Sequence, residues 1–198
     1  MGSEKVLAIV QARLGSSRLP KKVMMDVAGE PMLIRVIRRV KAITGVDEVV
    51  LATTSAEQDR ALLDMAADYQ VPAYAGSEDD VLDRFYHTAK AFGAQTIVRV
   101  TGDCPLLDPE VSIRVLERFL LGDCDYASNT LKATFPDGLD TEVFSVQALT
   151  RAWQEATLKS EREHVTPFIW KNVDKFRTAN VENDPDLSAL RWTVDEPQ

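Results

Sequence analysis

The sequence contains very little cysteine and histidine. Its 198 residues include two cysteines, Cys104 and Cys124, and two histidines, His87 and His164. With no CxxC pair and so few ligand side chains, neither a zinc site nor a disulfide framework is expected. Such sparse cysteine usage is typical of a reducing compartment, so we expect a cytoplasmic protein.

Long apolar runs and an excess of positive charge are also missing. No stretch approaches the roughly 20 apolar residues of a membrane span, and the apolar run at residues 6–10 is too short for a signal peptide. The 31 acidic residues outnumber the 23 basic ones, which gives a formal net charge of −8. This balance argues against a general nucleic-acid or membrane-surface binder, so neither partner is expected.

Two common nucleotide-binding signatures are absent as well. The Walker A pattern GxxxxGK[ST] does not occur, and neither does GxGxxG. We therefore do not expect a P-loop NTPase or a Rossmann dehydrogenase.

The sequence does contain a regular alternation of short apolar strands and amphipathic helices. Leu33, Val36, Ile37 and Val40 recur at helical spacing. Strands are predicted at residues 6–10, 47–54, 71–76 and 96–100. Helices are predicted to start near Pro31, at a capping box of Ser55 and Gln58, at Ser77 and Asp80, and at the N-cap Asp108.

The pattern changes after residue 122. Further strands are predicted within residues 123–129, 139–146, 176–184 and 190–196, with helices from Val146 and from a capping box of Ser160 and Glu163. The expected fold class is α/β, a mostly parallel central sheet with helices on both faces, extended by a mixed α+β C-terminal part. We expect a single domain over residues 1–198, with a nucleotide-binding half (1–121) and a substrate-binding half (122–198).

The loop after the first strand, "QARLGSSRLPKK" at residues 11–22, is basic and small in an otherwise acidic chain. Ala12, Gly15 and two serines would let the backbone approach a phosphate closely. Arginine offers a planar fork for phosphate oxygens and lysine a point charge. The pattern is equally consistent with a solvated basic turn. The cations are Arg13, Arg18 and Lys22.

A second loop, "TGDCP" at residues 101–105, follows the buried strand at 96–100. Ligands of parallel sheets bind outside the carboxyl ends of the strands, so both loops are expected at one edge. An aspartate there, Asp103, is suited to hold Mg²⁺ on a triphosphate; on its own it is equally typical of a turn. Cys104 is expected to be a small buried side chain.

Six ordered fragments together resemble the cytidylyltransferase family, over essentially the whole chain. They are "QARLGSSRLPKK", "GSEDDVLDRF", "RVTGDCPLLDP", "PDGLDTEVF", "SEREHVTPFI" and "TVDEP". The branch that they resemble is the spore-coat polysaccharide biosynthesis protein F group, which is related to KDO and acylneuraminate cytidylyltransferases.

The resemblance implies a nucleotidyltransferase fold of the glycosyltransferase-A type and Mg²⁺-dependent transfer of CMP from CTP to a sugar acid, with release of pyrophosphate. It implies that the protein takes part in surface or spore-coat polysaccharide biosynthesis. A homodimer is possible on the same grounds. The resemblance assigns the triphosphate to Arg13, Ser16, Arg18 and Lys22, together with Ala12, and the metal to Asp103 and Asp195.

This sequence departs from the family pattern at three positions. Lys21 stands where glycine is common, Gln11 where many relatives carry proline, and Thr101 where sugar-acid synthetases usually carry glutamine. The first two changes remove no donor. The third affects base and sugar specificity, so Thr101 is expected to contact the nucleotide.

Weaker signals remain open between a site and a structural role. Ser77 and Asp79 resemble the segment that approaches the nucleotide, or only begin a helix with an acidic first turn. Asp140 and Glu142 share one strand face and could line the sugar site, or follow a Pro-Asp-Gly turn before an edge strand. His164 is a candidate substrate contact or a helix-face histidine.

Two alternatives to a cytidylyltransferase are a glycosyltransferase of the same fold, which consumes a nucleotide sugar, and a non-catalytic nucleotide-binding module. A DxD metal motif at the end of a catalytic strand would favour the glycosyltransferase. The tripeptide Asp123-Cys124-Asp125 has this form, but it follows a helix end rather than the strand at 96–100. We interpret it as a chance match.

Overall fold

The computed structural model describes residues 4–15 and 19–194, and its strands form one seven-stranded sheet in the order β3-β2-β1-β4-β6-β5-β7. β6 runs antiparallel to its neighbours β4 and β5, and the other pairings are parallel. The expected mostly parallel sheet is confirmed. The strands are β1 (Val6–Gln11), β2 (Glu48–Thr54), β3 (Ala73–Gly76), β4 (Thr96–Thr101), β5 (Tyr126–Ser128), β6 (Glu142–Ser145) and β7 (Thr178–Asn180).

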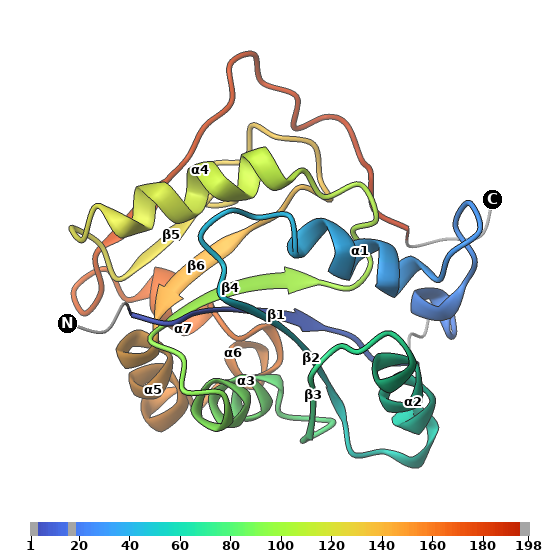
Figure 1. Ribbon diagram of the computed structural model, residues 1–198. Helices are drawn as coiled ribbons and strands as arrows, with labels where there is room; N and C mark the ends of the chain where they lie inside the picture. The colour runs from blue at the N-terminus through green and yellow to red at the C-terminus, as the bar shows by residue number, and fades with distance from the viewer. Residues whose placement is uncertain (1–3, 16–18, 195–198) are drawn as a thin grey trace.

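Helices cover both faces of the sheet. α1 (Met32–Val40), α2 (Arg60–Asp68) and α4 (Pro109–Leu120) pack on one face. On the other face lie α3 (Val81–Ala91), α5 (Val146–Glu155), α6 (Lys159–His164) and α7 (Pro167–Lys171). Figure 1 shows α1 and α4 above the sheet and α3, α5 and α6 below it. Two 3-10 turns, η1 (Lys22–Met24) and η2 (Glu57–Asp59), complete the elements.

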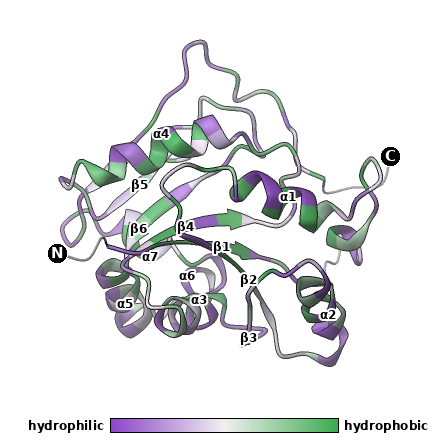
Figure 2. Cartoon of the chain, in the orientation of Figure 1, coloured by the Kyte–Doolittle hydropathy of each residue, from purple (hydrophilic) through white to green (hydrophobic). Residues whose placement is uncertain are grey.

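The central strands are buried from both sides. Along β1, Leu7 and Ile9 pack into the core below the sheet, while Ala8 and Val10 pack into the core above it. Such continuous apolar runs are typical of parallel strands covered on both faces. Figure 2 shows apolar and polar stretches alternating along α1 and α4, as expected of helices with one buried face. No helix within the described ranges is long and apolar enough to cross a membrane.

Several predicted helix boundaries are confirmed. The Asp80 side chain accepts the Asp83 N–H at 2.9 Å at the start of α3, and Asp108 accepts the Glu110 N–H at 2.9 Å at the start of α4. Gly93, with φ +66°, follows the end of α3 in the left-handed conformation that glycine allows at little cost.

Both predicted capping boxes are wrong. The 3-10 turn η2 precedes α2, so Asp59 rather than Ser55 occupies its N-cap position, and no side chain caps this helix. Near residue 160 the helix starts earlier than expected, because the buried Glu161 accepts the Leu158 N–H at 3.2 Å and fixes the first turn there. Ser160 therefore lies inside α6.

The strand predicted at residues 190–196 is also wrong as far as the chain is described. The backbone of residues 190–192 forms hydrogen bonds with the Pro-Asp-Gly turn instead. The Asp137 N–H donates to the Leu190 carbonyl at 3.0 Å, and the Trp192 N–H donates to the Asp137 carbonyl at 2.7 Å. A Cβ at Gly138 would lie 2.9 Å from the Trp192 backbone carbon, so this close approach requires glycine. The strand after this turn, β6, lies inside the sheet rather than at its edge.

Candidate active site

A cleft of about 440 Å³ opens at the carboxyl ends of β1 and β4. These two strands are parallel neighbours with Gln11 opposite Thr101, so the loops that follow them meet at one edge, on the right in Figure 1. The cleft is lined by residues 11–13, 15, 22 and 23 of the first loop, Val81 and Arg84 of α3, residues 101–103, and Glu163 and His164 of α6.

The basic loop is fixed by a buried carboxylate. The Leu14 N–H donates to Asp59 Oδ1 at 2.7 Å, and the Thr54 hydroxyl donates to the other oxygen of the same carboxylate. Asp59 has no solvent exposure. A charge-assisted bond inside the protein orders backbone that would otherwise be mobile. The start of the loop, at Leu14, is therefore held by β2 and η2.

The two loops touch through Gly102. Its N–H donates to the Gln11 carbonyl at 2.9 Å, and a Cβ there would lie 3.1 Å from both the Ala12 Cβ and the Gln11 oxygen. Real Cβ contacts are rarely this short, so any side chain at this position would push the loops apart.

Lys22 and Asp103 form an ion pair across the cleft, with 2.7 Å between Nζ and Oδ2. Their side chains are 12% and 27% exposed, so the pair faces the cleft rather than bulk solvent. Lys21, just before, has φ +58°, a left-handed conformation that favours glycine. This backbone geometry explains the commoner glycine of the family pattern at that position.

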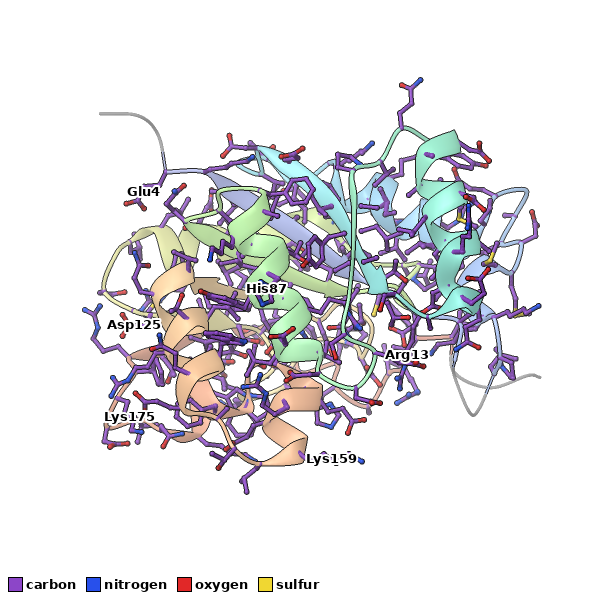
Figure 3. The ribbon with its side chains drawn as sticks, turned by 90° about the horizontal axis from the view of Figure 1, so that it is seen from below. Glu4, Arg13, His87, Asp125, Lys159 and Lys175 are labelled. Atoms are coloured by element: carbon purple, nitrogen blue, oxygen red, sulfur yellow. The ribbon has the colours of Figure 1, made fainter. Side chains whose placement is uncertain are left out.

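Arg13 is exposed and lines the cleft from the same loop. Figure 3, which views the molecule from below, places its label on the side opposite Asp125 and Lys175. The structure thus gathers Ala12, Arg13, Lys22, Thr101 and Asp103 around one cleft.

A second cavity of about 400 Å³ adjoins the first. Thr101 and His164 line both, so the two cavities meet at these side chains. Its lining combines hydroxyl, carboxylate and cationic groups with one indole ring: Arg99, Thr101, Thr130, Asp140, Glu142, Ser160, His164, Thr166, Pro167, Trp170 and Lys171.

Glu142 lies at the floor of the second cavity, but its carboxylate is already occupied. It pairs with Arg99, accepts the Tyr126 hydroxyl at 2.7 Å and accepts the Thr166 hydroxyl at 2.5 Å. The residue is 7% exposed. Burial and the negative charge of Glu142 keep the pKa of Tyr126 well above its ordinary value, so Tyr126 is the donor. The structure gives Glu142 a role in holding the cavity floor together.

Asp140 also lines the second cavity, and the residue as a whole is exposed. Burial of the carboxyl group, and then the charges of Asp137 and Glu142, raise its pKa to about 6. Asp103 adds to the rise, and Arg99 opposes it.

This raised pKa predicts a pH-dependent stability. A carboxyl group whose pKa is higher in the folded chain than in the unfolded one favours folding while protonated, so the benefit is lost as pH rises from about 4 to about 6. Asp140→Asn cannot ionise. Its melting temperature is therefore expected to rise relative to the wild type across this window and to stay higher above it. Melting curves recorded from pH 4 to pH 7 check this, with Asp68→Asn, at an exposed position, as the control. If the melting temperatures of Asp140→Asn and the wild type change in parallel with pH, the prediction is wrong.

His164 is held by a strained turn between α6 and α7. The Thr166 N–H donates to the His164 carbonyl at 2.9 Å, and Val165 between them has φ +73° and ψ −57°. A β-branched residue rarely adopts this γ-turn, and such strain clusters at functional sites. The turn places the His164 side chain where the two cavities meet.

Not every predicted site residue lies at the cleft. Among the described lining residues, the segment around Ser77 contributes Val81 and Arg84 instead of Ser77 or Asp79. The Ser77 oxygens serve structure: the hydroxyl accepts the Asp80 N–H at 3.0 Å, and the carbonyl accepts from Arg84 at 2.6 Å. Ser16, Arg18 and Asp195 lie outside the described residues.

The described chain ends next to Asp103. The Val194 N–H donates to the Asp103 carbonyl at 3.2 Å. Within the described ranges, no group of three or more histidine, cysteine, aspartate and glutamate side chains forms a metal site.

The Asp123-Cys124-Asp125 tripeptide is not part of the cleft. Asp123 pairs with Arg118 at 2.6 Å, and Asp125 pairs with Arg177 at 3.0 Å. The tripeptide therefore gives no support to the glycosyltransferase alternative.

Cys104 is buried. Burial, and then the charge of Asp103, raise its pKa to about 12, which suits a packing residue rather than a nucleophile.

Sequence reasoning missed three residues that shape the site: Asp59, Arg84 and Arg99. Asp59 and Arg84 each lie within a stretch that predicts an ordinary amphipathic helix, and Arg99 interrupts an apolar strand. The single available signal was Arg99, because a charge within a buried strand requires a partner.

Comparison with known proteins identifies relatives along the full chain. The profile of the cytidylyltransferase family matches residues 7–193. Spore coat polysaccharide biosynthesis protein SpsF of Bacillus subtilis is 31% identical over 197 residues, which cover 96% of this chain and 81% of SpsF. A cytidylyltransferase structure from Leptospira borgpetersenii has a TM-score of 0.92 at 32% identity, over 97% of this chain and 82% of the other.

A more distant structure, CMP:2-keto-3-deoxy-manno-octonic acid synthetase complexed with CTP, has a TM-score of 0.72 at 20% identity, over 98% of this chain and 94% of the other. This likeness shows the shared fold. Together the sheet, the family profile and the cytidylyltransferase structure that is 32% identical define a nucleotidyltransferase. Within that class, the chain belongs to the cytidylyltransferase family.

Proposed function

We propose that this protein transfers CMP from CTP to a sugar acid and releases pyrophosphate, in the biosynthesis of a surface polysaccharide. The observation that carries the proposal is the pair of cavities that meet at Thr101 and His164. The first cavity offers cations that would bind a triphosphate, and the second offers polar groups that would bind a sugar. The CMP group would be transferred where the two cavities meet.

In this scheme a sugar hydroxyl attacks the α-phosphorus in line. The bond from that phosphorus to the oxygen bridging to the β-phosphate breaks, pyrophosphate leaves, and the hydroxyl proton passes to water or a basic group. Charge grows on the phosphoryl oxygens and the leaving group, so catalysis rests on positioning and electrostatic stabilisation. Arg13 and Lys22 would hold this charge, with Ser16 and Arg18 completing the loop.

The second cavity would take the acceptor. Asp140 and the hydroxyls of Thr130 and Ser160 offer hydrogen bonds to sugar hydroxyls, and Lys171 offers a cation for a carboxylate. The Bacillus relative is named for spore coat polysaccharide biosynthesis, and the synthetase relative for a sugar acid. These names support an acid as the acceptor and a surface polysaccharide as its destination.

The donor set fits Mg²⁺. Mg²⁺ is held in proteins by one or two carboxylates together with phosphate oxygens and water, and Asp103 presents a carboxylate to the cleft beside the chain that leads into Asp195. Asp103 and Asp195 would hold the ion, which when bound polarises the reacting phosphate and neutralises charge.

A pyrophosphate-release assay tests this function. The protein, Mg²⁺ and each of the four nucleoside triphosphates are combined with a panel of eight- and nine-carbon sugar acids and their neutral parent sugars. We expect release with CTP and an acid alone. Release with neutral sugars but no acid would overturn the acceptor class, and release with another triphosphate would overturn the donor. CTP binding without turnover on the panel would favour a non-catalytic module.

A further inference from the structure

Arg84 is a charged side chain buried at the nucleotide cleft. It is 2% exposed and the largest of the fully buried side chains, yet it contributes to the cleft lining from the first turn of α3. Its stem packs on Gly76, where an added Cβ would lie 3.1 Å from the Arg84 Cγ. The absence of a side chain at Gly76, at the end of β3, therefore makes room for the stem of Arg84.

The guanidinium makes few of the bonds that it could make. Nη1 donates to the Ser77 carbonyl at 2.6 Å. Nε has no hydrogen-bond partner, and across the described residues Nη2 has none either. Nε and Nη2 form the edge that binds two acceptors side by side.

Other arginines of this chain use that edge. Arg162 donates from Nε and Nη2 to the Asp80 carboxylate at 2.9 and 2.6 Å, and Arg177 donates from the same atoms to Asp125 at 3.2 and 3.0 Å. In Arg84 the equivalent edge makes no such pair with the described residues. Leaving a buried charged donor unpaired is costly, which points to a bound ligand as its partner.

None of the residues that the structure describes supplies that partner. Asp59, Glu78 and Asp80 lie close enough to act on the charge of Arg84, but none accepts a hydrogen bond from it. Burial, and then the nearby Arg13, lower the pKa of Arg84 to about 10, so it stays charged at neutral pH.

The location of Arg84 distinguishes between the parts of a bound nucleotide. Arg13 and Lys22 already supply cations for phosphates from the loop. The cleft residue nearest to Arg84 along α3 is Val81, an apolar side chain that suits the face of a flat ring. Cytosine presents two adjacent acceptors, N3 and O2, on one edge, whereas uracil carries a hydrogen on N3 and would oppose one of the two donors.

We propose that Arg84 determines the choice of nucleobase by donating from Nε and Nη2 to N3 and O2 of cytosine. The inference rests on the proposed use of CTP. A bidentate arginine contact discriminates between bases by roughly ten- to a hundredfold. Arg84 is thus a specificity-determining residue rather than one that assists the chemical step.

Calorimetric titration of the wild type, Arg84→Met and Arg84→Lys with CTP, UTP, 3-deaza-CTP and inorganic triphosphate tests this. The wild type is expected to prefer CTP over UTP and over 3-deaza-CTP, which lacks the N3 acceptor, by ten- to a hundredfold. Both variants should lose most of that preference and keep the wild-type affinity for inorganic triphosphate. Arg118→Met replaces a partly exposed arginine that pairs with Asp123 away from the cleft; it is the control and should match the wild type.

The possible failures are distinguishable. A wild type that does not bind CTP would overturn the proposed function, on which the inference depends. A selective wild type with variants that remain selective would overturn the role of Arg84 alone. An equal loss of affinity for CTP, UTP and inorganic triphosphate would assign Arg84 to the phosphates instead and also overturn the inference. If Arg84→Met fails to fold, as its melting curve would show, Arg84→Lys keeps the charge and the stem and decides the question.

Discussion

Replacement of Asp103 by asparagine is expected to lower kcat for CMP transfer by roughly 10²–10³-fold, the loss typical of removing one preorganised electrostatic group at developing charge. Asp103 is suited to this role because it presents a carboxylate to the cleft, 2.7 Å from Lys22 and at the junction of the β1 and β4 loops. Asparagine keeps the shape of the side chain but removes the charge. Steady-state pyrophosphate release at saturating CTP and acceptor measures the effect.

The loss should be confined to catalysis. The Lys22–Asp103 pair is partly exposed, so its removal should change the free energy of unfolding by only about 1 kcal/mol. Asp123→Asn is the matched control, because Asp123 belongs to the DxD tripeptide and lies away from the cleft. It should retain full kcat. Near-full turnover of Asp103→Asn, or an equal loss in Asp123→Asn, would contradict the assignment of the site.

The architecture could be predicted because its signals are local. The continuous apolar runs of β1, β2 and β4 and the helical periodicity of α1 require no knowledge of distant residues. The same holds for the basic loop, since two loops at the carboxyl ends of neighbouring parallel strands must share an edge. Arg13, Lys22 and Asp103 could therefore be expected to lie near one another.

The errors concern residues whose partners are distant in sequence. The capping box predicted at Ser55 fails because η2 precedes α2, and the Asp59 carboxylate at the N-cap position binds the backbone of Leu14, 45 positions away. Residues 190–194 form no strand of the sheet, because the Leu190 carbonyl and the Trp192 N–H bond to the turn at Asp137 and the Val194 N–H bonds to Asp103. The local sequence indicates which hydrogen bonds a residue can make, and the tertiary structure determines which of them it makes.

Glu142 is the sharpest such case. Its alternation with Asp140 predicts two side chains in one polar pocket, and both do line the second cavity. Asp140, which is exposed, remains available to an acceptor. Glu142 instead receives donors from β4, β5 and the start of α7, namely Arg99, Tyr126 and Thr166.

Glu142→Ala is therefore expected to destabilise the fold by about 3–5 kcal/mol, since it leaves the Arg99 charge, whose side chain is only 14% exposed, without its carboxylate partner. For a chain of this size that corresponds to a fall of roughly 10 °C in melting temperature. Urea unfolding at neutral pH, followed by far-UV circular dichroism, measures the loss. The double variant Arg99→Met/Glu142→Leu should recover part of it, because no lone charge remains. The Tyr126 and Thr166 hydroxyls still lose an acceptor, and Gln11 loses the donor Arg99 Nε. If Glu142 instead bound the acceptor directly, Glu142→Ala would keep its stability and raise the KM for the acceptor alone. A stable variant with that kinetic change would return Glu142 to the substrate, whereas an unstable single variant rescued by the double variant would establish it as the buried anchor of the cavity floor.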